Sequence, residues 1–195
     1  MSEPSDSAPA TRSRNADIMI GVAAVLISAI SLALAISANH TQERLLAAST
    51  WPFLQYGTGN RTEEGESVIT MSLYNGGIGP ARIHSIQVLY ENQFQVDAAR
   101  LLQSCCNPNA KPLSTVTSAG AGVLAADSKA TFLHVSEKDN DPEVWTNFNQ
   151  ERFKVRVLVC YCSVLKDCWT FDSTQSEPAP IDRCPVIPDS ALWHG

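Results

Sequence analysis

An uninterrupted apolar segment near the N-terminus constrains the fold of this chain more than any other feature. Residues 18–38 read IMIGVAAVLISAISLALAISA and include no charged side chain. As an α-helix with a rise of 1.5 Å per residue, such a segment spans about 30 Å, the thickness of the hydrocarbon core of a bilayer. A buried core helix is the alternative, but the segment has no second, polar face. We therefore predict a membrane-spanning helix over residues 18–38.

The sequence around this segment favours a retained anchor over a cleaved signal peptide. The preceding residues are long for the charged region of a signal peptide, and the apolar run exceeds the usual length of roughly 7–15 residues. Arg12 and Arg14 precede the span, whereas Arg44 after it is offset by Glu43. By the positive-inside rule the N-terminus then lies in the cytoplasm. We expect a single-pass protein of the cytoplasmic (inner) membrane, with everything after Ala38 outside, in the periplasm.

Changes in composition divide the chain into five parts. We expect a short disordered cytoplasmic tail over residues 1–17, the transmembrane helix over 18–38 and a helical stalk over 39–50. A β-sandwich domain is expected over residues 51–173, followed by an extended, Pro-rich C-terminal tail over 174–195. Short strands separated by Gly, Pro and Asn are typical of a sandwich. The expected fold is therefore a transmembrane helix followed by a mainly-β, immunoglobulin-like sandwich with one or two short helices.

Within the sandwich, alternating apolar residues indicate the strands and capping residues indicate the helices. Ile69, Met71 and Leu73 share one face of a half-buried strand, and the next strand, 81–90, alternates less cleanly. Asp97 and Asp141 are suited to begin two short helices. Further strands are expected at residues 113–118, 129–135, 153–162 and 168–171.

All six cysteines follow the apolar segment, at positions Cys105, Cys106, Cys160, Cys162, Cys168 and Cys184. In an oxidising compartment outside the membrane, an even number of cysteines indicates a set of disulfides. In the cytosol the same residues would favour a metal site. The predicted topology therefore decides between these two interpretations, and it favours disulfides.

The stretch VLVCYCSVLKDCWTF, residues 157–171, predicts a hairpin closed by a disulfide. If Cys162 and Cys168 oppose each other, Tyr161 faces Trp169 and one face of the hairpin is apolar. Directly opposed residues at a site without hydrogen bonds have Cα atoms about 4.5 Å apart, within reach of a disulfide. A register shifted by one residue would scatter the aromatic side chains over both faces. We therefore expect a Cys162–Cys168 disulfide.

The partners of the other four cysteines are left open by the sequence. Cys160 has Cys184 or one of the adjacent pair Cys105 and Cys106 as a candidate partner. We expect the two adjacent cysteines to bond to different partners rather than to form a redox switch. A zinc site built from the last four cysteines is the competing interpretation, but their spacing is not that of a zinc ribbon or finger. We therefore predict structural disulfides, with no bound metal or cofactor.

Motifs for catalysis or nucleic-acid binding are missing from the sequence. It contains no G-x-S-x-G, no P-loop and no G-x-G-x-x-G, and its four histidines are dispersed. The net charge is −6 and no basic run occurs, so nucleic-acid binding has no electrostatic footprint. We predict no catalytic residues from these patterns.

Two segments suggest contacts with partners. The turn formed by Asn75, Gly76, Gly77, Gly79 and Pro80 is expected to be a rigid connection between strands, and a partner-docking loop is the functional alternative. Within the membrane segment, small side chains recur at four-residue spacing, at Ala29, Ala33 and Ser37. Such spacing lets helix backbones approach closely, so self-association through this helix is a further expectation.

Three motifs resemble those of a group of uncharacterised bacterial single-pass membrane proteins. They are WPFL at residues 51–54, NGGIGPA at 75–81 and YCSVLKDCW at 161–169. The group shares W-P-[FY]-L, N-x-G-x-G-P-A and Y-C-S-x-x-x-x-C-W, and the resemblance extends from about Trp51 to Trp169. It implies a bacterial envelope protein with an external β-rich domain, and it implies no activity.

Two classes of function remain. The one we favour is a non-enzymatic, membrane-anchored binding or accessory module of the cell envelope. Its partners would be the lipid bilayer, through residues 18–38, and another envelope protein or an unknown ligand. The alternative is an extracytoplasmic enzyme whose catalytic residues are dispersed along the chain. A cleft that gathers ionisable side chains with shifted pKa values would favour the enzyme, and an exposed apolar patch would favour the partner.

Overall fold

The computed structural model describes residues 14–111 and 122–194. The predicted strand at residues 113–118 and most of the predicted N-terminal tail lie outside this part of the chain. The described residues belong to two compact units, divided between Leu46 and Ala47. The first unit is helical and the second is mostly β, and each is described by itself below.

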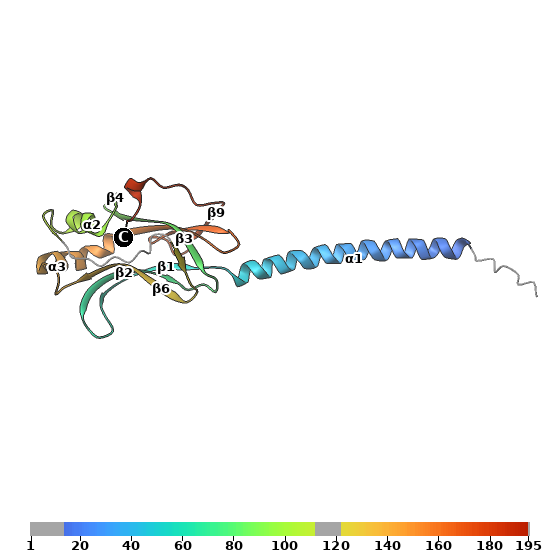
Figure 1. Ribbon diagram of the computed structural model, residues 1–195, viewed down its shortest axis with the longest axis horizontal. Coiled ribbons are helices and arrows are strands. Elements are labelled where there is room, and N and C mark those ends of the chain that lie inside the picture. Colours follow the sequence, from blue (N-terminus) through green and yellow to red (C-terminus); the bar gives the residue numbers. More distant parts are fainter. Residues whose placement is uncertain (1–13, 112–121, 195) are drawn as a thin grey trace, which may run out of the picture. The chain divides into compact units, whose positions relative to one another are not determined.

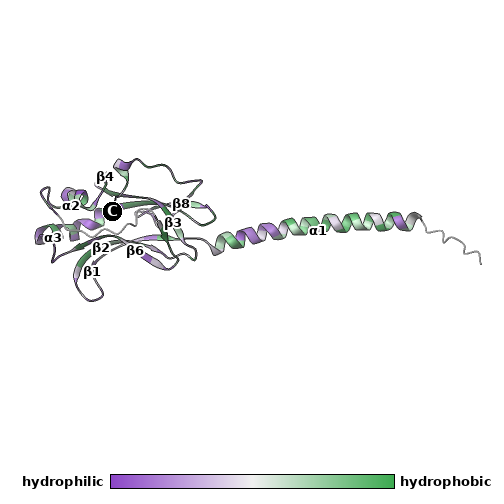
Figure 2. Cartoon of the chain, in the orientation of Figure 1, coloured by the Kyte–Doolittle hydropathy of each residue, from purple (hydrophilic) through white to green (hydrophobic). Residues whose placement is uncertain are grey.

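A single long helix, α1, extends from Arg14 to Ser49. It includes the whole predicted span and continues through almost all of the predicted stalk. Its residues from Ala16 to Ser49 are long and apolar enough to cross a membrane, and none of the most apolar window is buried. Figure 2 shows this apolar run in green, followed by a short purple stretch toward the end of the helix. A signal sequence passes the same test of length and composition, so the structure shows a candidate membrane helix.

The second unit contains two antiparallel sheets, which form separate layers in Figure 1. The first has the order β1-β2-β6, with bounds Leu54–Arg61, Ser67–Asn75 and Ser128–Ser136. The second has the order β4-β3-β7-β8-β9, with bounds Gln93–Gln95, Ala81–Tyr90, Arg156–Cys162, Cys168–Asp172 and Ala179–Ile181. A further short strand, β5 (Gly122–Leu124), pairs with the start of β3. The expectation of a mostly-β, two-sheet domain is confirmed.

One hydrophobic core lies between the sheets. The predicted inward face of β2 is confirmed, because Ile69, Met71 and Leu73 are completely buried. They belong to the same core cluster as Val88 of β3 and Tyr161 of β7, on the other sheet. Period-two alternation therefore supplies an apolar inner face to each layer.

Both predicted short helices are present, and each begins at its predicted cap. In α2 (Ala98–Cys105) a carboxylate oxygen of Asp97 accepts a hydrogen bond from the Arg100 backbone N–H at 2.7 Å. In α3 (Pro142–Glu151) Asp141 accepts from the Glu143 N–H at 2.8 Å. Such bonds satisfy backbone donors that the first turn leaves unpaired. A short 3₁₀ turn, η1 (Arg152–Lys154), joins α3 to β7.

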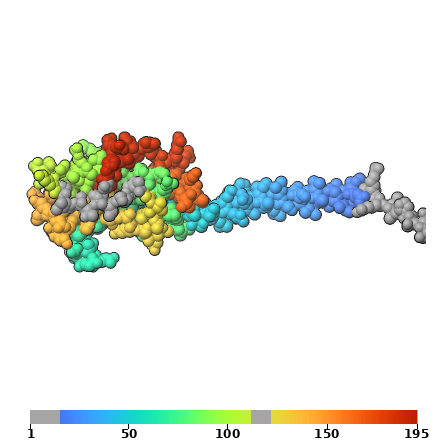
Figure 3. All heavy atoms as spheres, in the orientation of Figure 1, coloured from blue at the N-terminus to red at the C-terminus, as the bar shows by residue number. Residues whose placement is uncertain are grey.

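The C-terminal segment is more than the extended tail expected for residues 174–195. It adds β9 to the second sheet and a 3₁₀ turn, η2 (Asp189–Ala191). The Trp193 ring is 4% exposed and packs edge-on against Phe132, with ring centroids 6.0 Å apart. Its backbone N–H donates to the Ile86 carbonyl at 2.9 Å. The space-filling view shows this segment, in red, forming part of the domain's surface (Figure 3). Burial of the indole therefore makes it part of the domain.

Candidate functional site: a basic groove beside two disulfides

The β7–β8 hairpin has the register that its sequence predicts. Cys162 is opposite Cys168 and Tyr161 is opposite Trp169, whose rings stack with centroids 5.8 Å apart. The sulfurs of Cys162 and Cys168 are bonded to each other. In the connecting turn, the Ser163 hydroxyl accepts hydrogen bonds from the backbone N–H groups of two later turn residues, at 3.1 and 3.3 Å. Backbone pairing, the disulfide and these bonds together fix the turn.

A second disulfide lies directly beside the first. Cys160 is bonded to Cys184, which follows β9 by three residues, so this bond joins β7 to the C-terminal segment. Cys160 and Cys162 are two residues apart on β7 and therefore point to the same side of the strand. The sulfurs of Cys162 and Cys184, which belong to different disulfides, are 3.9 Å apart. The structure thus brings the last four cysteines into one cluster.

A β-bulge in the neighbouring strand adds a histidine to this cluster. The register between β3 and β7 shifts by one residue between Ile83 and Ser85, so His84 is the extra residue. Around the bulge, Ile83 is buried while Arg82 and His84 are exposed on the outer side of the sheet. Arg82 is directly opposite Cys162, and a ring nitrogen of His84 lies within 4.8 Å of the cluster's two neighbouring sulfurs.

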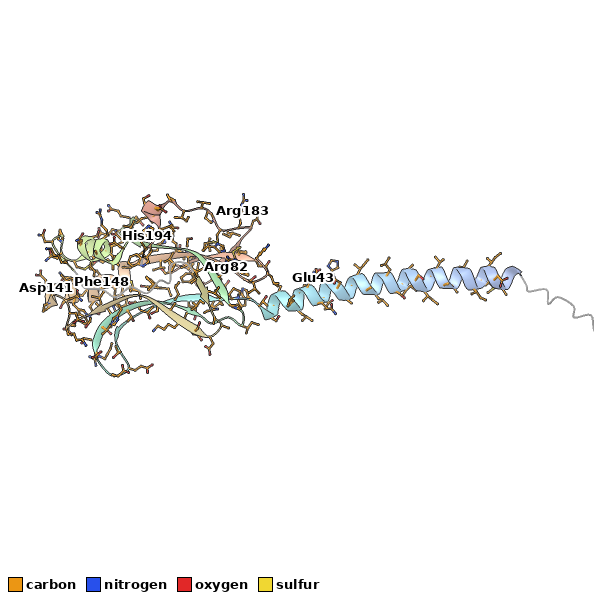
Figure 4. The ribbon with its side chains drawn as sticks, viewed as in Figure 1. Glu43, Arg82, Asp141, Phe148, Arg183 and His194 are labelled. Carbon is orange, nitrogen blue, oxygen red and sulfur yellow. A yellow bond between two sulfur atoms is a disulfide. The ribbon has the colours of Figure 1, made fainter. Side chains whose placement is uncertain are left out.

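These residues form one wall of a groove of about 720 Å³, which we call the basic groove. It is lined by Pro80, Arg82, His84, Val123, Cys162, Ser163, Val164, Lys166, Cys168, Asp182, Arg183 and Cys184. Arg82, Lys166 and Arg183 are cationic, and Asp182 is the single carboxylate among the lining residues. Figure 4 labels two of the cations, Arg82 from β3 and Arg183 from the segment after β9. Within the described ranges, none of the three cations forms an ion pair.

Exposed apolar side chains border the basic groove. Val123 and Val164 line it and are 69% and 60% exposed. Leu165 follows Val164 in the hairpin turn, and Ile78 precedes the groove residue Pro80 by two positions; both are also exposed. We call the two that line the groove, Val123 and Val164, the apolar rim. A charged groove with an apolar border is a surface suited to bind a partner.

In the oxidised form the cluster is chemically suited to thiol–disulfide exchange rather than to metal binding. The zinc site considered for these cysteines requires thiolates, and the cysteine sulfurs here are bonded in disulfides. Of the three grouped donors, only the His84 imidazole is then available as a ligand. A disulfide sulfur is instead the electrophile that an incoming thiolate attacks. The cations of the basic groove favour the thiolate form of an attacking or departing sulfur.

The pairing of Cys105 with Cys106 differs from our expectation that they bond to different partners. Their sulfurs are bonded to each other, at the C-terminal end of α2. The reason is that Cys160 pairs with Cys184 and Cys162 with Cys168, which leaves no other cysteine as a partner. This disulfide packs against the hydrophobic core and lies outside the groove.

The glycine-rich turn packs tightly against the segment that enters the domain. The Asn75 side chain is buried; its oxygen accepts from the backbone N–H groups of Phe53 and Gly77, both at 3.1 Å. Its amide nitrogen donates to the Gly79 carbonyl at 2.9 Å. A Cβ at Gly79 would lie 2.0 Å from the Thr50 carbonyl oxygen, so only glycine fits there.

The remaining residues of this turn are the ones that reach the surface. Gly76 and Ile78 are exposed, and Pro80 lines the basic groove. The turn is therefore a tightly packed connection between strands, and its tip and Pro80 are the parts that reach the surface.

The ionisable groups with strongly shifted pKa values lie elsewhere. Burial raises the pKa of Tyr56 and of Tyr161 to about 12. Hydrogen bonds from the Arg156 guanidinium lower the pKa of Asp172 to about 2, and Arg156 Nε is 3.0 Å from its carboxylate. None of these groups lines the basic groove.

Compared with models of protein families, with curated proteins and with solved structures, the chain has no significant match.

Proposed function

We propose that this protein is a membrane-anchored, extracytoplasmic binding module whose β-domain is an immunoglobulin-like sandwich. The observation that carries the proposal is the exposure of the apolar side chains of α1. Met19, Leu26 and Leu34 are 72%, 57% and 66% exposed, and none of the helix's most apolar window is buried. In water such a surface is unfavourable, whereas in hydrocarbon every one of these side chains is solvated and the helix satisfies its own backbone.

The orientation we propose places the β-domain in the periplasm. The three disulfides belong to the domain after the helix, and disulfides persist in oxidising compartments. The arginines before the span favour a cytoplasmic N-terminus. The assignment to a bacterial inner membrane rests on the resemblance of the three motifs described above.

The binding surface we propose is the basic groove with its apolar rim, and its partner is an envelope protein that presents an acidic, partly apolar segment. The groove has three cationic side chains against one carboxylate, although the chain as a whole has a net charge of −6. Complementary charge steers association, and the exposed apolar side chains add to the affinity when a partner buries them.

The alternative, an extracytoplasmic enzyme, is less well supported. An acid–base site gathers groups whose pKa values are shifted toward the working pH. Here the strongly shifted groups are core tyrosines and an aspartate in an ion pair, and they are outside the basic groove. Binding is therefore the function that the geometry of the groove supports best.

Affinity purification with a charge-reversal variant tests the proposal. The full chain, tagged on the external domain, is purified from detergent-solubilised membranes, alongside the double variant Arg82→Glu/Lys166→Glu. We expect the wild type to retain one or more envelope proteins, and we expect this retention to be lost in the variant and to weaken as salt is raised. The matched control is Arg100→Glu/Lys138→Glu, two surface cations that do not line the basic groove.

Two outcomes would count against the binding surface. One is equal recovery of the same partner by the wild type and the groove variant, which would place the contact elsewhere. The other is the loss of the partner in the control as well, which would indicate a non-specific effect of net charge. Failure to recover any partner in repeated purifications would contradict the binding module itself.

A further inference from the structure

Four cysteine sulfurs form one row beside the basic groove, and three of the four cysteines line it. Cys168 is bonded to Cys162, the Cys162 sulfur is 3.9 Å from that of Cys184, and Cys184 is bonded to Cys160. The middle distance is close to contact between two sulfur atoms that belong to different disulfides. A thiolate on Cys162 would therefore already lie next to an electrophilic sulfur, without any movement of the backbone.

We propose that this cluster is a thiol–disulfide exchange site, which accepts two electrons from a dithiol and rearranges to a Cys162–Cys184 disulfide. The substrate class is a dithiol, either of a protein or of a small molecule. The inference depends on the sulfur cluster alone and does not require the membrane anchor or the envelope partner.

Contact with two grooves points to Cys168 as the sulfur that is attacked first. Three of the four cysteines line the basic groove: Cys162 and Cys168 are 6% and 7% exposed and Cys184 is half-buried, whereas Cys160, 4% exposed, does not line it. Cys168 also lines a second groove, together with Trp169 and Pro180. A thiolate of the dithiol attacks the Cys168 sulfur and forms a mixed disulfide with it. The Cys162–Cys168 bond breaks, and its electron pair leaves on Cys162.

The second step uses the short distance between the disulfides. The Cys162 thiolate attacks the Cys184 sulfur and forms the Cys162–Cys184 bond. The Cys160–Cys184 bond breaks, and its electron pair leaves on Cys160, which takes up a proton.

The third step releases the product. The second thiol of the dithiol loses its proton and attacks its own sulfur in the mixed disulfide, so that Cys168 departs as a thiolate and is protonated. The dithiol has become a disulfide, and the protein now holds one disulfide in place of two, with thiols at Cys160 and Cys168. Two electrons and two protons have been transferred.

The groove supplies the electrostatics for this sequence. Arg82 is directly opposite Cys162 in the β3–β7 register, on the same side of the sheet. The bulge places His84 beside the Cys162 and Cys184 sulfurs, and Lys166 belongs to the turn between Cys162 and Cys168. Positive charge beside a departing sulfur stabilises the thiolate and speeds exchange.

Two single substitutions, made in the full chain and purified under oxidising conditions in detergent, test the inference. Cys168→Ser leaves Cys162 as a thiol beside Cys184, whereas Cys162→Ser leaves Cys168 as a thiol and serves as the matched control. After acid quenching and alkylation, we expect Cys168→Ser to show a Cys162–Cys184 cross-link and alkylated Cys160. We expect Cys162→Ser to be alkylated at Cys168, with Cys160–Cys184 intact. Cleavage after Tyr161 separates Cys160 from Cys162 in the peptide analysis.

A second measurement uses the wild type and so does not depend on the folding of either variant. The oxidised protein is treated with less than one equivalent of dithiothreitol, quenched with acid and alkylated. We expect alkylation of Cys160 and Cys168 together with the Cys162–Cys184 cross-link. Alkylation of Cys162 and Cys168 with Cys160–Cys184 intact would overturn the inference, as would a Cys168→Ser variant that is alkylated at Cys162 alone.

Discussion

Replacing Trp193 with alanine tests how firmly the C-terminal segment is held in the domain. The indole is almost completely buried and packs against Phe132, and only a 3₁₀ turn separates it from the segment that carries Cys184. If this packing is weak, the segment should detach at little cost. If Trp193 is a true core residue, its loss should destabilise the whole domain.

Two opposing terms set the expected magnitude. Truncating a buried Trp to Ala typically costs about 3–5 kcal/mol of unfolding free energy. Among the described residues, however, the Trp193 Nε1–H has no hydrogen-bond partner. Removing a buried, unsatisfied donor recovers about 1–3 kcal/mol. The packing term is the larger of the two, so we expect Trp193→Ala to lower the unfolding free energy by about 2 kcal/mol.

Trp193→Phe separates the two terms, because it keeps most of the ring contact and removes the N–H. We expect this variant to lie within about 1 kcal/mol of the wild type. Val186→Ala, in the same segment but at a side chain that is 98% exposed, is the neutral control and should change stability by less than about 0.5 kcal/mol. Urea unfolding of the detergent-solubilised chain, followed by far-UV circular dichroism, measures all three variants. A Trp193→Ala variant as stable as Val186→Ala would refute the assignment of this segment to the core.

Two further predictions concern an ion pair and a glycine. Asp172→Asn should cost about 1 kcal/mol at neutral pH, a value kept small because solvent reaches the partner Arg156. Folding lowers the Asp172 pKa from 3.8 to about 2, so the stabilisation by its carboxylate is fully present above pH 3.8 and is lost as the pH falls through about 2. Urea unfolding across this range should therefore show the unfolding free energies of the wild type and the variant converging. Gly79→Ala should lower the unfolding free energy by about 1–3 kcal/mol, because the new Cβ would overlap the Thr50 backbone. Gly57→Ala is the control: its Cβ would meet nothing within 4 Å, so overlap should not destabilise it. Equal thermal stability of these two glycine variants would contradict the tight packing of the turn.

The hairpin at the site was predictable because only one register both pairs its cysteines and places its apolar side chains on one face. With Cys162 opposite Cys168, residues from Val155 to Phe171 place an apolar face toward the core, and the structure has this register. The same local logic identified the inner face of β2 and the two capped helices. These features depend on residues that are close in sequence, so patterns of alternation and capping predict them directly.

The features that make the groove depend on contacts between distant segments. The bulge at His84 left one trace in the sequence, the imperfect alternation of residues 81–90, but this trace does not show which strand lies opposite. The partner of Cys160 is 24 residues away, so local geometry does not choose it. Trp193 was overlooked because its segment is rich in proline, and only the packed domain shows that its indole is buried against Phe132.

Protease accessibility in spheroplasts is the most direct test of the proposed membrane topology. Spheroplasts that express the full chain are treated with an external protease, and the washed membranes are analysed by intact mass. We expect a membrane-bound chain that keeps residues 18–38 and loses its β-domain to the protease. The variant Leu26→Arg/Ile30→Arg should leave the membrane fraction, because each central arginine costs roughly 2.5–3.5 kcal/mol on insertion scales. A soluble mature form that lacks the apolar helix, or a β-domain protected until the membrane is broken, would contradict the account.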